Sequence, residues 1–241
     1  MQARRILRRL TPRPLRRKTI VSLTFDDGSA DHVAVARLLA DRGLQATFFV
    51  NSNHVGAEPK YLDWPEVAEI AALGHEVGGH TSDHVKLDET PADEAASQIT
   101  GDRRRLEARG YEVTSFAYPY GAWNETARAL VADAGYTSAR RAWGLAFPGA
   151  RAEAVSELVP PADPFGVRTV PSFEQGVTLE TMQRVVVRGE VEGGWLPLVF
   201  HCIVPEGTRY DLPEDLFRDF VDWLRARTRS EVRTVGSVVA G

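Results

Sequence analysis

Three short polar segments of the chain could carry chemistry together. Residues 24–28 read Thr-Phe-Asp-Asp-Gly, residues 80–84 read His-Thr-Ser-Asp-His, and residues 200–201 read Phe-His. Each segment follows a short apolar or β-prone run, so each is expected at the end of a strand. Two adjacent carboxylates, two histidines four residues apart and a third, distant histidine could supply a general base, three metal ligands and a general acid. This set of groups can hydrolyse an amide or an ester with a bound metal ion.

The histidine pair has the spacing of a metal site. His80 and His84 are four residues apart, and on one helical turn both imidazoles can reach the same ion. Two histidines and one carboxylate are a common ligand set of catalytic zinc and leave a position for water. A bare pair with this spacing more often consists of loop histidines that only form hydrogen bonds, but the preceding Gly78-Gly79 and the acidic pair elsewhere favour a metal site. Three other histidines lack such a setting and are expected to be structural or exposed: His32, His54 and His75.

The acidic pair, His201 and the turn 118–121 each leave two interpretations open. Asp26 and Asp27 point in different directions at a strand end, so one could bind the metal while the other faces the attacking water. Such close carboxylates repel each other unless a cation or a shared proton relieves them, although Asp-Asp-Gly is also good turn chemistry. His201 ends an apolar run, so it is either a core residue or a site residue. The segment Tyr-Pro-Tyr-Gly at 118–121 is either a plain turn or a source of N–H groups for an oxyanion.

Strand-like apolar runs alternate with helical patterns along the chain. Strands are expected at 20–25, 46–50, 75–79, 114–118, 136–139, 196–201 and 232–235. Helices are expected at 31–42, 64–73, 90–109, 125–134, 178–190 and 213–227, with a long proline-rich loop at 144–176. The alternation predicts a parallel sheet covered by helices, in which chemistry gathers at the carboxyl ends of the strands. Five candidate residues follow these strands and are expected at one edge: Asp26, Asp27, His80, Tyr120 and His201.

The composition limits the class of partner. The 241 residues carry a net charge of −4, but residues 1–18 hold eight basic residues and no acidic ones, which leaves 21 basic against 33 acidic residues in the remainder. An acidic body argues against nucleic acid as the main partner. The leader lacks the apolar run of a secretory signal, and no stretch approaches the ~20 apolar residues of a membrane span. We expect residues 1–18 to be a poorly ordered basic extension of a domain at 19–241, in the cytoplasm by default or, alternatively, in the cell envelope or secreted.

Together these motifs resemble the polysaccharide deacetylases, the NodB homology domain of carbohydrate esterase family four, over residues 19–241. The resemblance implies a distorted (β/α) barrel of about seven parallel strands and one divalent ion, most often zinc. By position, the resemblance makes Asp27, His80 and His84 the metal ligands, Asp26 the catalytic base and His201 the catalytic acid. It also assigns the Tyr120 backbone N–H to the oxyanion and, more loosely, Trp143 to the substrate groove.

The implied reaction is hydrolysis of the acetamide of an N-acetylglucosamine-containing glycan, with acetate as a product. Removal of O-acetyl groups, as on xylan, needs the same groups and is the nearest alternative, and a small intracellular amide is another. Many family members have an arginine that pairs with the base, and the aligned position here is Ala117. This departure favours a third alternative, a metal-bound glycan-binding domain without turnover, whereas Asp26 and His201 argue against it. The aspartate that supports the family's catalytic histidine is not obvious, and Asp163 is a weak candidate.

Overall fold

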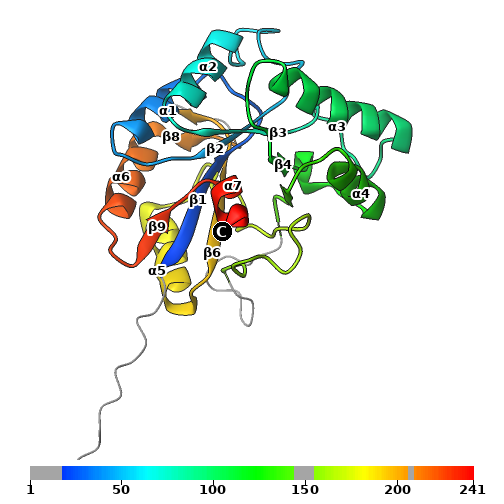
Figure 1. Cartoon of the computed structure of the whole chain (residues 1–241). Coiled ribbons are helices and arrows are strands. Elements are labelled where there is room, and N and C mark those ends of the chain that lie inside the picture. The colour runs from blue at the N-terminus through cyan, green and yellow to red at the C-terminus, as the bar shows by residue number, and fades with distance from the viewer. Residues whose placement is uncertain (1–17, 144–154, 206–208) are drawn as a thin grey trace, which may run out of the picture.

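The computed structural model describes residues 18–143, 155–205 and 209–241. In these ranges seven parallel strands form one curved sheet in the order β5-β4-β3-β2-β1-β6, with β9 beside the first half of β1 (Figure 1). The strands are β1 Thr19–Phe25, β2 Thr47–Val50, β3 Glu76–Gly79, β4 Ser115–Ala117, β5 Ser138–Arg140, β6 Trp195–Phe200 and β9 Ser230–Val232. The predicted basic extension lies outside the described residues except for Lys18.

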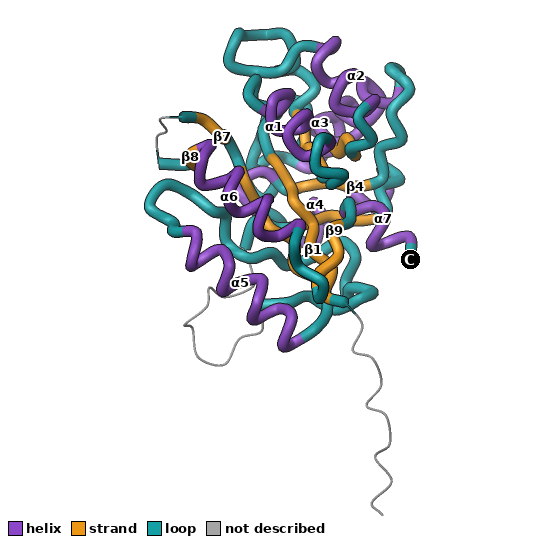
Figure 2. Tube along the Cα trace, turned by 90° about the vertical axis from the view of Figure 1, so that its left-hand side faces the viewer, coloured by secondary structure: helices purple, strands orange, loops and turns teal. Residues whose placement is uncertain are grey.

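Helices cover the outer face of the sheet and pack in neighbouring pairs, α1 with α2, α3 with α4 and α5 with α6 (Figures 1 and 2). Their bounds are α1 His32–Ala40, α2 Trp64–Ala72, α3 Ala92–Glu107, α4 Glu125–Asp133, α5 Leu179–Glu192 and α6 Glu214–Arg225. The short helix α7, Val235–Ala240, packs against the inner face instead. Two short strands, β7 Ile203–Val204 and β8 Leu212–Pro213, pair with each other, and a 3₁₀ turn spans Pro119–Gly121. None of the helices in the described ranges has the length and apolarity needed to cross a membrane.

The sheet is buried on both faces, as parallel sheets are. On the outer face, Val21, Leu23 and Phe25 of β1 belong to the large core between strands and helices. On the inner face, a smaller core gathers Phe49 of β2 and Trp195 of β6 with four other side chains, those of Ala117, Val167, Val235 and Val238. This second core fills the interior of the barrel, and α7 contributes to it.

The segment after β5 closes the gap between the two edge strands. The Val167 N–H donates to Ala139 O at 3.0 Å, and the Phe173 N–H donates to Val199 O of β6 at 3.0 Å. The sheet therefore curls into a distorted barrel, which confirms the predicted fold. The described part of the loop expected at 144–176 is irregular, but its backbone is tied to both neighbouring strands.

The end of the chain differs from the prediction. The strand expected at 232–235 is instead β9, at Ser230–Val232, followed by the helix α7. Thr234 is the N-cap of this helix, and its hydroxyl accepts the Ser237 N–H at 3.4 Å. Val235 and Val238 are both buried, and their three-residue spacing is helical. An apolar run this short does not by itself distinguish a strand from a helix.

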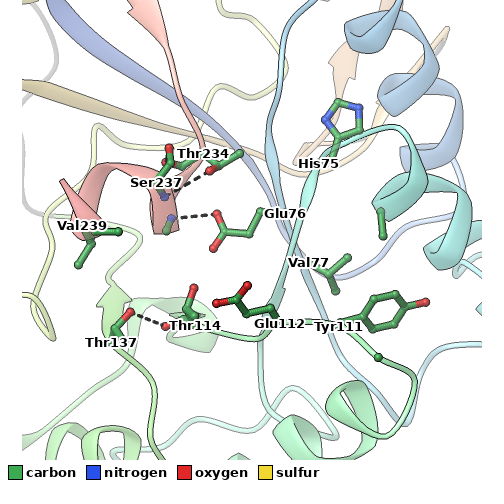
Figure 3. A pocket seen from close by; sticks show the side chains of 14 residues that line it. His75, Glu76, Val77, Tyr111, Glu112, Thr114, Thr137, Thr234, Ser237 and Val239 are labelled. Atoms are coloured by element: carbon green, nitrogen blue, oxygen red, sulfur yellow. Dashed lines mark hydrogen bonds between the residues drawn. The ribbon is translucent and has the colours of Figure 1, made fainter.

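Two cavities lie at the amino ends of the strands, opposite the predicted active edge. One, of about 740 Å³, is lined by Glu76, Glu112, Thr114 and residues of α7, among others (Figure 3). The other, of about 920 Å³, is lined by Ile20, Leu158, Val159 and Glu231, among others. At the first cavity, one oxygen of Glu76 accepts the Thr47 hydroxyl at 2.7 Å and the Gly236 N–H at 3.0 Å, which ties α7 to β2 and β3.

Candidate active site

The carboxyl ends of β1, β3 and β6 bring the predicted site residues to one edge of the barrel. Phe25 and Phe200 are register partners at the ends of β1 and β6, and the Asp26 N–H donates to Phe200 O at 3.0 Å. Asp26 therefore lies beside His201, the next residue after β6. His80 directly follows β3, which is two strands from β1.

Asp27, His80 and His84 converge on one point. The Asp27 Oδ1 atom lies 3.1 Å from His84 Nε2 and 3.4 Å from His80 Nε2, and the three candidate ligand atoms are all within 4.8 Å of one another. Asp27 Oδ1 is buried and makes no hydrogen bond of good geometry to a described residue. His80 Nδ1 donates to Ala117 O at 2.7 Å, which leaves its Nε2 lone pair for a cation. This donor set fits a divalent ion such as zinc.

The electrostatics of these residues also favour a positive charge among them. Burial by itself raises the pKa of Asp27, but the imidazoles of His80 and His84 outweigh it and hold that pKa well below its usual value. Burial lowers the pKa of His80, but Asp27 and Asp26 outweigh this effect and raise it. The negative charge of Asp26 and Asp27 can be balanced either by a proton on His80 or by a cation between the three residues.

The loop that carries the two histidines is held by buried polar groups. The Asp102 carboxylate accepts the His80 N–H and the Ser52 N–H, each at 2.9 Å, and the Asn51 amide donates to His80 O and Thr81 O. Burial raises the pKa of Asp102 to about 6, although the N–H groups that it accepts oppose this rise. Asp102 on α3 thus joins the ends of β2 and β3 directly behind the candidate metal ligands.

Arg140 pairs with Asp26, and the sequence did not indicate this partner. The Arg140 Nη2 atom donates to Asp26 Oδ1; the arginine side chain is fully buried, and the aspartate side chain is 5% exposed. Arg140 ends β5, and Ala117 of β4 is its register partner. A buried arginine therefore stands one strand away from the position where the resemblance places one. The predicted strand ended at Ala139, one residue short of it.

Arg140 keeps further hydrogen-bonding capacity. Its Nε and Nη1 atoms are buried without a partner among the described residues. Its guanidinium carbon lies 4.6 Å from the centroid of the Phe49 ring, so the ring helps to hold the cation in place. Asp26 therefore has a partner that is fixed by packing on the inner face of the barrel.

His201 is held through its backbone, whereas its side-chain support differs from the prediction. His32 Nε2 donates to His201 O at 2.9 Å, and His32 is fully buried. The Nδ1 atom of His201 is buried without a partner in the described ranges. Asp163, the candidate for supporting it, instead accepts Arg128 at 2.9 and 3.1 Å and the Phe165 N–H at 3.0 Å. That candidate is wrong, because the Asp163 carboxylate binds Arg128 of α4 and not His201.

Tyr120 and Trp143 lie together at the rim of the site. Tyr120 sits in the 3₁₀ turn with φ of 58°, and its exposed ring is 4.4 Å from the His84 ring between centroids. Trp143 is also exposed and borders the same turn, because a Cβ on Gly121 would come within 2.9 Å of its ring. The structure thus places the Tyr120 ring against a candidate metal ligand, and Trp143 beside the turn that carries Tyr120.

Comparisons with known proteins show which family the chain resembles. The family model described as polysaccharide deacetylase matches residues 14–139. A chitooligosaccharide deacetylase of Azorhizobium caulinodans is 36% identical over 110 residues, which are 43% of this chain and 49% of the relative. The peptidoglycan-N-acetylglucosamine deacetylase PgdA of Listeria monocytogenes is 34% identical over 108 residues, which are 44% of this chain and 22% of that protein. The chain thus matches half or less of the length of these curated relatives.

A solved structure shares the fold over nearly the whole chain. It is a mutant of BA3943, which is a pseudoenzyme of carbohydrate esterase family four, and the mutant has restored enzymatic activity. The match has a TM-score of 0.63 with 17% identity, over 95% of this chain and 72% of that one. At this identity the match shows the fold alone.

Proposed function

Because the chain belongs to the polysaccharide deacetylase family, we propose that it removes acetyl groups from N-acetylated glycans with one divalent metal ion, and that it releases acetate and a free amino sugar. The observation that carries the proposal is the meeting of three groups at one edge: the Asp27–His80–His84 cluster, the Asp26–Arg140 pair and His201. Binding a glycan would require neither a positioned carboxylate nor an acid.

Each residue has a distinct part in the proposed reaction. Asp27, His80 and His84 hold the ion, which when bound supplies Lewis acidity to the acetyl carbonyl and to the attacking water. Asp26, held by Arg140, takes the proton of that water. The Tyr120 backbone N–H helps to stabilise the oxyanion, and His201 gives a proton to the leaving amine.

The proposed substrate class is a glycan that contains N-acetylglucosamine. Two relatives in different organisms are named as deacetylases of chitooligosaccharide and of peptidoglycan N-acetylglucosamine, which supports the amide over an ester. The non-catalytic alternative rested on the missing arginine at position 117. Arg140 occupies the neighbouring register position and bonds to Asp26, so that reason no longer applies.

The test is acetate release by protein that is stripped of metal with a chelator and then reloaded with zinc. Chito-oligosaccharides, peptidoglycan and acetylated xylan are compared, and the double variant His80→Ala/His84→Ala is the control for the metal site. We expect zinc-dependent release from the first two substrates and none from the double variant. Release from xylan alone would instead make the protein an O-acetyl esterase, and release that is indifferent to the chelator would contradict the metal proposal.

The role of His201 is tested with two leaving groups. An amine must be protonated to depart, whereas a phenolate leaves without help. His201→Ala should therefore lower turnover of an N-acetylated oligosaccharide far more than turnover of an aryl acetate at the same pH. An equal loss on both substrates would assign His201 to binding or structure.

A further inference from the structure

Exposed aromatic rings gather at the candidate active edge. Among the described residues, the exposed large aromatic side chains are Tyr120, Trp143 and Tyr210. The exposed large aliphatic ones lie at 158–159 and on the outer helix α5, where Val187 and Val191 stand. Tyr120 and Trp143 belong to the turn region already described. Tyr210 belongs to none of the motifs that the sequence singled out.

Tyr210 lies beside the proposed acid. Its ring centroid is 6.2 Å from that of His201, with the two planes tilted by 58°, and the residue remains 54% exposed. The Arg209 guanidinium carbon lies 5.5 Å from the Tyr210 ring centroid. A cation thus borders the ring, and more than half of the residue is still free to meet a ligand.

The segment that carries Tyr210 is anchored next to the site. Leu212, two residues further on, is buried and pairs with Ile203 in the β7–β8 ladder. The Leu212 N–H donates to Cys202 O at 2.9 Å, and the Ile203 N–H donates to Asp31 Oδ2 at 2.7 Å. These bonds tie the base of the Tyr210 segment to the two residues that directly follow His201.

The chemistry of the leaving group places a sugar at this ring. An acid that protonates the amine must approach its nitrogen to about 3 Å, and that nitrogen is bonded directly to a carbon of the sugar ring. The sugar therefore has to lie on the His201 side of the acetyl group, within a few bond lengths of the imidazole. Tyr210 is the exposed aromatic ring that the structure places there.

We propose that Tyr210 binds the sugar ring that carries the acetamide and thereby positions the leaving amine against His201. This inference rests on the proposed deacetylase function. It assigns the recognition of sugar to the His201 side of the site and leaves the acetyl group to the metal side. A small acetate ester without a sugar has nothing for Tyr210 to bind.

The experiment compares Tyr210→Ala, Tyr210→Phe and Tyr210→Trp on chito-oligosaccharides and on a small alkyl acetate, which carries neither a sugar nor an aromatic ring. For Tyr210→Ala we expect KM on the glycan to rise roughly tenfold, which corresponds to ~1.4 kcal/mol of lost binding, and KM on the alkyl acetate to change less than roughly twofold. The Phe and Trp variants keep a ring and should stay close to the wild type. Leu158→Ala, which truncates an exposed apolar side chain at the opposite end, is the matched control.

A binding measurement separates this inference from the proposed function. Metal-loaded Asp26→Asn protein is titrated with a chito-oligosaccharide, with and without Tyr210→Ala, and the two dissociation constants should also differ roughly tenfold. A difference of less than twofold, or equal losses by Tyr210→Ala on the glycan and on the alkyl acetate, would overturn the role of Tyr210. Wild-type protein that releases no acetate from any glycan would overturn the proposed function, and the titration would still decide whether Tyr210 contacts the sugar.

Discussion

The two ends of the barrel are built in opposite ways. At the carboxyl end, Asp27, Thr81, His84 and Tyr120 all have positive φ, and they are the only non-glycine residues with this conformation in the described ranges. The same end contains buried polar atoms without hydrogen-bond partners, on Asp27 and His201 among others. Such strain costs about 1–3 kcal/mol for each residue and persists only where the surrounding structure enforces it.

The amino end is held by a compact hydrogen-bond network instead. The Thr47 hydroxyl donates to Glu76 at 2.7 Å and accepts the Val235 N–H at 2.9 Å, and the Gly236 N–H also donates to Glu76 (Figure 3). Glu76 Oε1 and, at the second cavity, Ser156 Oγ depart from this pattern, because both are buried without a partner in the described ranges. The amino end therefore stabilises the barrel, whereas the carboxyl end holds strained backbone and unpartnered polar atoms that lower stability but suit a reaction.

The largest effect that the comparison predicts is on turnover at the carboxyl end. Asp26→Asn removes the proposed base but leaves Asp27, His80 and His84 in place, so the protein should keep its metal and lose roughly 10²–10⁴-fold in kcat. Metal content by mass spectrometry and acetate release are measured on the same preparation. A variant that loses its metal would show that the two aspartates have been assigned the wrong way round.

Arg140 links the strained end to the interior of the barrel, and its removal should affect both stability and activity. Arg140→Ala leaves Asp26 buried without its partner, and breaking a buried ion pair costs about 3–5 kcal/mol of unfolding free energy. Arg184→Ala, which breaks an exposed pair with Glu180, is the control and should change stability little. Urea unfolding measures both variants.

A second substitution tests whether an arginine at position 117 of β4, where the resemblance places one, can replace Arg140 of β5, its register partner. Register partners on adjacent parallel strands are about 4.8 Å apart and point to the same face, so Ala117→Arg in the Arg140→Ala background should restore part of the activity. No recovery, in a double variant that folds, would mean that the guanidinium must approach Asp26 from β5.

These residues also show where the sequence was sufficient and where it was not. The strand ends that carry Asp26 and His201 could be predicted, because each follows an apolar run that needs a buried strand. The segment before His80, at 75–79, is a weaker strand pattern, and the alternation with helices and the histidine motif itself placed it. Arg140 could not be predicted, because its contact depends on the register between two short strands, which the sequence of neither strand specifies. The helix α7 was missed because its valines fit both a strand and a helix until the packing against Phe49 and Trp195 decides between them.

A smaller effect, on stability alone, is expected at the amino end. Glu76→Ala leaves the Gly236 N–H and the Thr47 hydroxyl without their acceptor, which should cost about 1–3 kcal/mol of unfolding free energy. The kcat of the folded protein should not change. Glu112→Ala removes a carboxylate from the same cavity and is the control. A loss of kcat in Glu76→Ala at temperatures where it is fully folded would show that the two ends are not independent.

The smallest predicted effect tests the strain itself, with paired substitutions at one exposed residue of each end. Tyr120 has φ of 58°, and both Tyr120→Gly and Tyr120→Ala remove its ring, but only glycine also removes the Cβ that disfavours this conformation. Tyr120→Gly should therefore be more stable than Tyr120→Ala by about 1 kcal/mol.

The same pair of substitutions at Leu158, which has no such conformation, should give the reverse order. There the alanine variant should be more stable by about 0.4–1 kcal/mol, because glycine has more backbone freedom to lose on folding. Urea unfolding of the four variants measures both differences. The same order at both positions would mean that Tyr120 stores no strain, and the contrast between the two ends would then rest on the unpartnered polar atoms alone.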